Sequence, residues 1–269
     1  MIITQGQIER LLKEDIGHHD VNNDVPGETT GRLVAKESGV AAGVDAAAQV
    51  FEYLDCETAV QVGSGDSVDA GDIVLETDGK AKSVLRAERT GVNIAGHASG
   101  VATRTRMAVD RARTVSETVR VAGTRKTTPG LRGLEKRAIV AGGGDTHRLD
   151  LSHMVLIKDN HIAEMGMETA IERFREKASF ATKIEVEVET PEAGSRAAEA
   201  GADIVLFDNL TPKEIEQGLR SLPENTLAEA SGDITLTDIP AYAETGVDII
   251  SMGSLTHSAD TLDYSFRTG

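Results

Sequence analysis

Lys183-Ile184-Glu185-Val186-Glu187-Val188-Glu189 is the stretch that decides the fold. Alternate side chains of a strand point to opposite faces, so Glu185, Glu187 and Glu189 share one face and the aliphatic residues share the other. Buried carboxylates are costly unless they meet cations, a metal or water. The acidic face therefore predicts a barrel interior with a charged, wet site. An edge strand with a solvated acidic face is the alternative that the pattern leaves open.

Short aliphatic segments alternate with amphipathic segments on both sides of this strand. Repeating βα units predict a parallel sheet, and their number predicts a closed or nearly closed barrel. The expected strands are 118–123, 154–158, 183–188, 204–208, 227–230 and 247–252. The expected helices are 131–141, 167–177, 191–200, 212–221 and 236–245.

The N-terminal part has a different texture. Thr4 is a plausible N-cap for a helix that begins the chain, and short strands are expected around 31–36, 40–44 and 73–77. The segment from 81 to 113 predicts one long helix, or two helices interrupted near Gly96 and Gly100. This region is predicted to be a small sheet with helices.

Composition and charge exclude several classes of function. The net charge is −16, which argues against general nucleic-acid binding because that needs a basic face. No stretch approaches the roughly 20 apolar residues that span a bilayer. A lone Cys56 excludes an intramolecular disulfide and a cysteine-based zinc site. An acidic surface fits a cytoplasmic enzyme, and we expect that location.

Cationic residues gather in one part of this acidic chain. The run Thr124-Arg125-Lys126-Thr127-Thr128-Pro129-Gly130-Leu131-Arg132 is followed by Gly142-Gly143-Gly144, His147-Arg148 and Leu156-Ile157-Lys158-Asp159-Asn160-His161. Concentrated positive charge next to glycine turns indicates a small substrate with several negative charges. A lone histidine is more often structural than catalytic, but beside Arg148 we interpret His147 as a substrate contact.

Charged residues also fall at the ends of the expected strands. Arg125 and Lys126 follow the first strand of the βα series, Lys158 ends the second, and Asp208 ends the fourth, while Glu187 lies within the third. In a βα barrel the active site lies at the carboxyl ends of the strands. A surface salt bridge would explain any single one of these residues, but not their common position.

Two glycine-containing loops follow the last two expected strands. Ser231-Gly232-Asp233 and Met252-Gly253-Ser254 lie where barrels bind phosphate through backbone N–H groups. His257 follows the second loop and is expected to line the same phosphate pocket.

The order and spacing of these motifs resemble those of quinolinate phosphoribosyltransferase over nearly the whole chain. The resemblance is carried by Ala87-Glu88-Arg89-Thr90 with Asn93, 124–132, Glu135-Lys136, the glycine run with His147-Arg148, 156–162, 185–190, Gly201-Ala202-Asp203 with Asp208-Asn209, Glu229-Ala230-Ser231-Gly232, and 242–257.

The resemblance implies an α/β protein with an N-terminal α/β sandwich domain and an open, incomplete α/β barrel of the type II phosphoribosyltransferase kind. The expected domains are 1–103 and 104–257, with residues 258–269 as a segment that could pack back on the first. It also implies a homodimer, or a hexamer built from dimers, in which the N-terminal domain of one subunit covers the barrel mouth of another.

The implied activity is transfer of phosphoribosyl from phosphoribosyl pyrophosphate to quinolinate with decarboxylation, a step of NAD biosynthesis that yields nicotinate mononucleotide. Mg²⁺ is the implied metal, near Glu187 and Asp208 either directly or through water, and no organic cofactor is expected. Small molecules, and neither nucleic acid nor membrane, are the expected partners. The implied substrate residues are Arg89 from a partner subunit, Thr124, Arg125, Lys126, His147, Arg148 and Lys158. The implied phosphate residues are Ser231, Gly232, Asp233, Met252, Gly253, Ser254 and His257, and the implied catalytic residues are Lys158, Glu187 and Asp208.

The chain departs from the family pattern at two positions. Asp233 stands where many relatives have a second glycine, which puts the contact of residue 233 in doubt, and Asp150 replaces a frequent glycine. A nicotinate phosphoribosyltransferase or a related protein of molybdenum metabolism is an alternative within the same fold. A non-catalytic sugar-phosphate sensor is an alternative of another class, although it would need only the phosphate loops.

Overall fold

The computed structural model describes residues 3–269, which divide into two compact units. Unit 1 holds residues 3–106, 127–143 and 255–269, and unit 2 holds residues 107–126 and 144–254. Residues 127–143 carry α4 (Arg132–Ala141) and group with unit 1 because Leu134, Ala138 and Ile139 belong to its apolar core. The domain bounds expected from the sequence place this helix in the other part, and that division stays a prediction.

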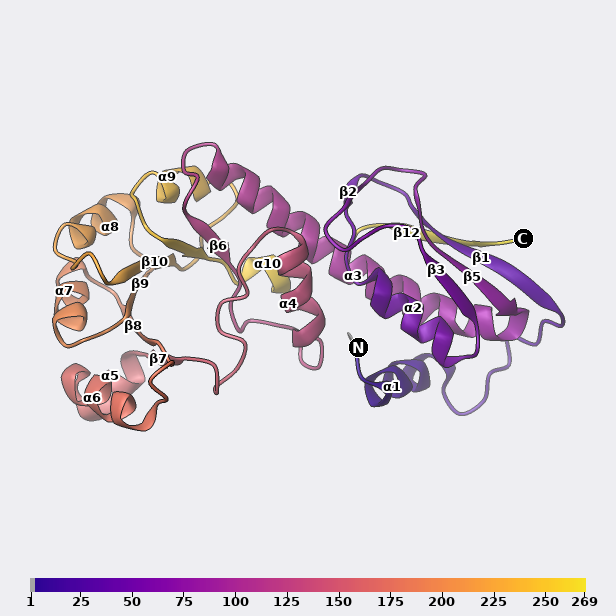
Figure 1. Cartoon of the computed structure of the whole chain (residues 1–269), viewed down its shortest axis with the longest axis horizontal. Coiled ribbons are helices and arrows are strands. Elements are labelled where there is room, and N and C mark those ends of the chain that lie inside the picture. Colours follow the sequence, from indigo (N-terminus) through magenta and orange to yellow (C-terminus); the bar gives the residue numbers. More distant parts are fainter. Residues whose placement is uncertain (1–2) are drawn as a thin grey trace. The chain divides into compact units, whose positions relative to one another are not determined.

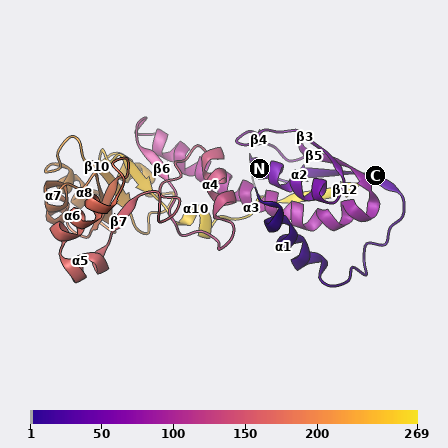
Figure 2. The ribbon, with the colours of Figure 1, turned by 60° about the horizontal axis from the view of Figure 1, so that its bottom comes forward.

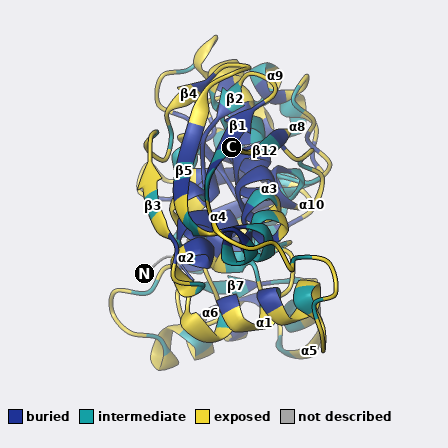
Figure 3. Cartoon of the chain, turned by 90° about the vertical axis from the view of Figure 1, so that its right-hand side faces the viewer, coloured by how far each residue is buried: buried dark blue, intermediate teal, exposed yellow. Residues whose placement is uncertain are grey.

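Unit 1 is built on a four-stranded antiparallel sheet with the order β12-β1-β5-β3. Its strands are β1 (Glu28–Ala35), β3 (Glu57–Val60), β5 (Ile73–Lys80) and β12 (Tyr264–Thr268). A separate two-stranded ribbon pairs β2 (Gly39–Val40) with β4 (Ser67–Val68). The edge strand β3 is largely exposed, whereas the inner strand β5 is buried at Val74, Leu75 and Thr77 and exposed at its ends (Figure 3). The predicted packing of the C-terminal segment takes the form of β12 pairing with β1.

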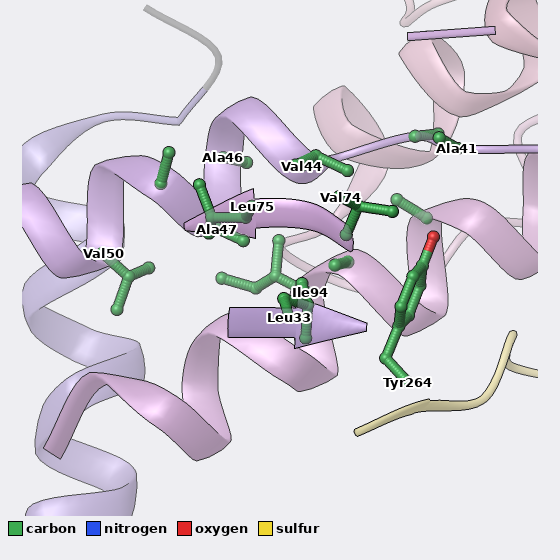
Figure 4. Close-up of a cluster of buried hydrophobic side chains, with 14 of the residues drawn as sticks. Leu33, Ala41, Val44, Ala46, Ala47, Val50, Val74, Leu75, Ile94 and Tyr264 are labelled. Atoms are coloured by element: carbon green, nitrogen blue, oxygen red, sulfur yellow. The ribbon is translucent and has the colours of Figure 1, made fainter. Parts of the chain in front are cut away.

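Helices cover one side of this sheet and enclose an aliphatic core. The helices are α1 (Gln5–Ile16), α2 (Val44–Tyr53) and α3 (Ala81–Arg113). Leu33 and Leu75 from the sheet meet Val50 and Ile94 from the helices (Figure 4). Thr4 caps α1 through its side chain, as the sequence predicts. Since aromatics make up only 3% of the chain, small aliphatic side chains fill most of this core.

Helix α3 runs without a break from Ala81 to Arg113. Of the two alternatives that the sequence leaves open, the single long helix is confirmed and the interruption near Gly96 and Gly100 is wrong. These glycines serve a close approach of backbone instead: the Gly96 carbonyl accepts a hydrogen bond from the Leu262 N–H at 3.0 Å, and a Cβ at Gly100 would overlap the Asp260 carbonyl oxygen. The two missing side chains leave room for the C-terminal segment to lie against the helix.

We expect Gly100→Ala to lower the free energy of unfolding by about 1–3 kcal/mol, because the new methyl group must push the Asp260 backbone away. Urea unfolding of the full chain measures this change. Gly133→Ala is the matched control, since Gly133 lies in α4 with nothing within 4 Å of its would-be Cβ. The control should be unchanged or stabilised by up to about 1 kcal/mol. Equal stability of Gly100→Ala and wild type would refute the close-approach explanation.

Unit 2 is a six-stranded parallel sheet with the order β6-β11-β10-β9-β8-β7. Its strands are β6 (Arg120–Ala122), β7 (Val155–Ile157), β8 (Ile184–Val188), β9 (Ile204–Asp208), β10 (Leu227–Ser231) and β11 (Ile249–Ser251). Within the described chain β6 and β7 do not pair with each other, so the sheet is open. The closed form of the predicted barrel is wrong, and the open α/β barrel implied by the family resemblance is confirmed.

Helices follow the strands of unit 2 and cover the outer face of the sheet (Figures 1 and 2). They are α5 (Asp159–Met165), α6 (Met167–Lys177), α7 (Pro191–Glu199), α8 (Pro212–Leu219) and α9 (Ile239–Ala243). The short α10 (Ser254–His257) follows β11, and residues 255–257 of it group with unit 1. Thr190 and Thr211 cap α7 and α8, each followed by a proline at the first helical position. Phe207 of β9 fits between these helices because Gly194 and Gly218 have no side chain to collide with its ring.

Candidate active site

The strand register of unit 2 places polar side chains on one face of the sheet. Residues paired across a parallel ladder point to the same side. Glu187 pairs with Leu206, Leu206 pairs with Glu229, and Asp208 pairs with Ser231. All five side chains therefore share the face opposite the helices. The polar members stand toward the carboxyl ends of the strands, where βα folds bind their ligands.

Strand β8 lies between β7 and β9, so the edge-strand alternative is wrong. Ile184, Val186 and Val188 are buried on the helix side, as the alternation predicts. On the other side Glu185 is completely buried, while Glu187 is partly exposed. Glu189 lies beyond the end of the strand and is exposed.

Lys158 and Glu187 form an ion pair at the carboxyl edge of the sheet. Lys158 Nζ donates to Glu187 Oε2 at 2.5 Å, and 44% of the lysine side chain remains exposed. Lys158 stands between β7 and α5, and its backbone N–H donates to His161 Nδ1 at 3.1 Å. The His161 ring packs edge-on against Phe174 of α6. The Lys158–His161 motif thus fixes the position from which the lysine reaches the sheet.

His147 lies against two buried carboxylates. Its Nε2 is 2.9 Å from Glu229 Oε2 and 3.5 Å from Glu185 Oε1. Burial lowers the pKa of His147, but the close carboxylates of Glu185 and Glu229 outweigh it and raise the pKa to about 10. Burial raises the pKa of Glu185, and Glu229 raises it further. The cluster therefore holds an imidazolium between two acidic groups.

The ligand atoms of His147, Glu185 and Glu229 lie within 4.8 Å of one another, a spacing that would also suit a metal ion. A metal requires a neutral imidazole nitrogen as its ligand. The raised pKa of His147 favours a protonated ring, which has no lone pair to offer. Without a metal, these three side chains form an ion-pair network on the inner face of the sheet.

The backbone of His147 is held as firmly as its ring. Asp145 joins β6 through a bridge to Ala122, and its side chain accepts the His147 N–H at 2.7 Å. The residue has φ +51, a left-handed conformation that is uncommon outside glycine. The acceptor on Asp145 supports this turn, which directs the side chain toward the sheet.

Arg148 is buried next to this cluster. Burial lowers the pKa of Arg148, and the like charge of Arg125 lowers it further. The charges of Glu185, Glu187 and Glu229 act in the opposite direction. Two guanidinium groups that repel each other beside carboxylates indicate a site prepared for an anion.

The loop that carries Arg125 begins directly after β6. The backbone N–H of Lys126 donates to Thr124 Oγ1 at 3.0 Å, which closes a tight turn. Lys126 is exposed, whereas Thr124 and Arg125 are half-buried. The bridge between β6 and Asp145 brings this loop and the His147 turn to the same end of the sheet.

The two predicted phosphate loops follow neighbouring strands. Gly232 has φ +96, and a Cβ there would overlap the Asn209 side chain, so only glycine fits. Asp233 follows with φ +40 and an exposed side chain, so it extends the glycine turn while its carboxylate reaches solvent. Ser251 Oγ donates to Ser231 Oγ at 2.9 Å and ties the strands together.

The second loop continues from β11. The Met252 N–H donates to the Ala122 carbonyl at 2.9 Å, which extends the pairing with β6. Gly253 is half-buried, and the Ser254 hydroxyl is buried without a hydrogen-bond partner among the described residues. A hydroxyl in that state is suited to a ligand oxygen.

Arg89 and His257 belong to unit 1. Arg89 lies on α3 and is 60% exposed, with a weak contact to Glu88 at 3.9 Å. It lines a pocket of about 250 Å³ together with Asn93 and His97, which follow it on the same face of the helix. His257 is exposed at the end of α10, and its Nδ1 is 2.7 Å from Ser258 Oγ.

Glu185 and Glu229 are the two site residues that sequence reasoning did not single out for a role. The alternation along β8 placed Glu185 on the acidic face, and Glu229 appeared only as part of a longer motif. Neither the strand order nor the partner of His147 can be read from periodicity. One feature of the sequence could have identified them: both carboxylates occupy positions where a covered parallel strand normally has apolar side chains.

The His147 cluster predicts a pH dependence of stability. Below the ordinary histidine pKa of 6.5 both folded and unfolded chains hold the proton, so the stabilisation is fully present. As pH rises toward about 10 it is progressively lost, because only the folded state still binds the proton. Urea unfolding between these pH values should show a steeper decline for wild type than for His147→Gln. Parallel curves would contradict the raised pKa.

Residues 21–99 match the family model of the quinolinate phosphoribosyl transferase N-terminal domain, and residues 101–267 match that of its C-terminal domain. The probable nicotinate-nucleotide pyrophosphorylase [carboxylating] of Methanothermobacter thermautotrophicus is 44% identical over 97% of both chains. The human nicotinate-nucleotide pyrophosphorylase [carboxylating] is 39% identical over 90% of this chain and 82% of its own. The crystal structure of NadC from Streptococcus pyogenes superposes with a TM-score of 0.91 at 37% identity, covering 98% of this chain and 97% of that one. The chain belongs to the quinolinate phosphoribosyltransferase family.

Proposed function

We propose that the protein transfers phosphoribosyl from phosphoribosyl pyrophosphate to quinolinate, with decarboxylation, to give nicotinate mononucleotide, pyrophosphate and CO₂. The observation that carries this proposal is the Lys158–Glu187 pair at the carboxyl edge of the sheet, together with the buried Arg148 and the half-buried His147. Anion-binding groups and acids stand on the same face, as a reaction between a dicarboxylate and a sugar pyrophosphate requires. Family membership supports the same reaction.

Arg125, Lys126, His147, Arg148 and Lys158 are the residues that we assign to the two quinolinate carboxylates. Charge-assisted hydrogen bonds to carboxylates are stronger than neutral ones. Arg148 is buried and close enough to Arg125 for its pKa to be lowered, so an anion between them relieves their repulsion. A monocarboxylate would leave part of this buried charge unpaired, which is why we assign a dicarboxylate and not nicotinate.

In the proposed reaction the quinolinate ring nitrogen forms a bond to ribose C1 while the bond from C1 to the pyrophosphate oxygen breaks. Positive charge develops on the ribose as the leaving group departs with the bonding electrons. Glu187 and Asp208 share one face of the sheet and stabilise that charge, as carboxylates do in glycoside cleavage. Lys158 contacts Glu187 and holds its carboxylate in place.

Glu187 and Asp208 are also the residues that we assign to Mg²⁺, directly or through water, because carboxylate oxygens are its preferred protein ligands. The donor set fits, since both side chains offer oxygens on the same face. When bound, Mg²⁺ neutralises negative charge on the pyrophosphate.

The decarboxylation needs no organic cofactor in this proposal. After the first step the ring nitrogen carries a positive charge. The bond from the adjacent ring carbon to its carboxylate then breaks and releases CO₂, and the electron pair left on carbon is stabilised by the neighbouring cationic nitrogen. A proton from water or a nearby acid completes the product. The turns at Ser231–Gly232 and Gly253–Ser254 are assigned to the 5′-phosphate, since consecutive backbone N–H groups there suit an anion.

We further propose that the protein acts as a homodimer, or as a hexamer of dimers, in which the partner subunit's Arg89 completes the quinolinate site. On its own subunit Arg89 is exposed and has only a distant contact to Glu88, so its guanidinium is available to another chain. Helix α3 is rigid and continuous, and such a helix can present an arginine to a partner without local folding.

Product analysis tests the proposed function directly. Purified protein is given phosphoribosyl pyrophosphate and Mg²⁺ with either quinolinate or nicotinate, and nicotinate mononucleotide and CO₂ are measured. We expect turnover with quinolinate, and we expect CO₂ to be released in an amount equal to that of nicotinate mononucleotide. Turnover of nicotinate alone would replace the dicarboxylate assignment with a nicotinate enzyme. Binding without turnover of either acid would favour a sensor.

A further inference from the structure

The His147 ring is held by carboxylates that come from two strands separated by a third. Glu185 lies on β8 and Glu229 on β10, with β9 between them. Both carboxylates face the same ring nitrogen, Nε2, and both are fully buried. The hydrogen bond and the ion pairs that the ring makes to Glu229 and Glu185 all use Nε2, which leaves Nδ1 on the opposite edge of the ring from the carboxylates.

Burying the Glu185 and Glu229 carboxylates in this sheet is unfavourable for the stability of the fold. Both oxygens of Glu185 and one oxygen of Glu229 have no hydrogen-bond partner among the described residues. A buried carboxylate costs several kcal/mol unless it is paired, and an apolar side chain of similar size is often as stabilising. Their register neighbours Ile204 and Leu206 are apolar. Stability alone therefore gives no reason for acidic residues at these two positions.

The geometry of Glu185 and Glu229 around His147 gives a reason for acidic residues at these two positions. The Asp145 side chain holds the His147 backbone N–H, and the carboxylates hold the Nε2 edge of the ring. A site for a dicarboxylate would be repelled by Glu185 and Glu229 if these faced it directly. The imidazole ring lies between the two carboxylates and the substrate site. The ring covers the negative charge and offers an N–H donor in its place.

We propose that Glu229 and Glu185 are positioning residues that hold the Nε2 edge of His147 and present its Nδ1 edge to a carboxylate of the pyridine substrate. This proposal rests on the proposed function, because it assigns a direction to a residue of that substrate site. Glu229 makes the shorter contact and contributes more to holding the His147 ring, while Glu185 supports the ring from the other side of β9.

Steady-state kinetics of Glu229→Gln and Glu185→Gln test the proposal. Glutamine keeps the size of the side chain and removes the charge. We expect the KM for quinolinate to rise by at least about tenfold in Glu229→Gln, since a charge-assisted contact is replaced by a neutral one. The KM for phosphoribosyl pyrophosphate should stay within about twofold, because nothing assigned to that substrate contacts Glu229. Glu224→Gln removes an exposed charge just before β10 and is the matched control.

The imidazole itself gives a readout that needs no substrate. Full-length protein labelled with ¹⁵N-histidine is examined at about pH 8, with His147→Gln to assign the signals. Wild type should show both ring nitrogens of His147 protonated, and Glu229→Gln should show a neutral ring. An active wild type together with a KM for quinolinate within about twofold in both variants would overturn the positioning role alone. An inactive wild type would overturn the proposed function as well, and the ring signals would then still decide whether the carboxylates hold His147.

Discussion

Lys158→Ala is expected to lower kcat/KM for quinolinate by about 10²–10³-fold, the usual effect of removing one preorganised donor from an active site. The side chain is half-exposed at the carboxyl edge of the sheet and pairs with Glu187. Its loss therefore removes a cation from the proposed substrate site and leaves the proposed catalytic carboxylate without its partner. Initial rates with quinolinate, phosphoribosyl pyrophosphate and Mg²⁺ measure the change.

The fold should survive this substitution, because Lys158 does not belong to the apolar core of either unit. Lys183→Ala is the matched control. Lys183 precedes β8 and contacts Asp203 at 3.6 Å at the opposite end of the strands, where no substrate group is assigned. Its turnover should be close to that of wild type, and circular dichroism should be unchanged for both variants. Near-normal turnover of Lys158→Ala would remove Lys158 from the proposed site.

Mixing two inactive variants is expected to restore activity. Arg89→Ala lacks the arginine proposed to act in the partner, and Lys158→Ala lacks the lysine of its own site. In a mixed dimer one site combines Lys158 of one chain with the partner subunit's Arg89 and is complete. After equal mixing, half of the dimers are mixed, so about a quarter of all sites should recover.

Subunit exchange must be verified by mass spectrometry of isotope-labelled chains. The control mixes Arg89→Ala with wild-type-like Lys183→Ala. Each mixed dimer then has one active site, so half of all sites stay active and exchange should cause no rise. Recovery in the first mixture identifies Arg89 as a residue that acts between subunits. Complete exchange with activity no higher than in the separate variants would show that Arg89 serves its own chain.

The overall fold followed from the sequence where local pattern and tertiary structure agree. The alternation along β8 predicted which side chains are buried against the helices, and Thr4, Pro191 and Pro212 marked helix starts correctly. The number of βα units did not reveal whether the barrel closes, because closure depends on pairing of β6 with β7 and not on any local signal. The resemblance to the family, which spans the whole chain, supplied that answer.

Gly96 and Gly100 show why local reasoning fails elsewhere. Glycine lowers helix propensity, so an interruption of α3 was a sound expectation. The reason for these glycines lies in the C-terminal segment, far away in the sequence, whose backbone presses on the helix. The carboxylate partners of His147 were missed for the same reason, since β8 and β10 become neighbours of one ring only through the strand order. The roles of the individual substrate residues stay predictions.

The pairing of β12 with β1 has a consequence for synthesis on the ribosome. β1 is made long before β12, so the outer edge of β1 has no partner until β12 has emerged. An unpaired strand edge is a template for association with other chains. The nascent chain can complete unit 2 before it can complete unit 1, because β12, which closes this edge, follows all residues of unit 2. Chains released early would therefore be expected to aggregate through the N-terminal sheet, however well their active-site half had folded.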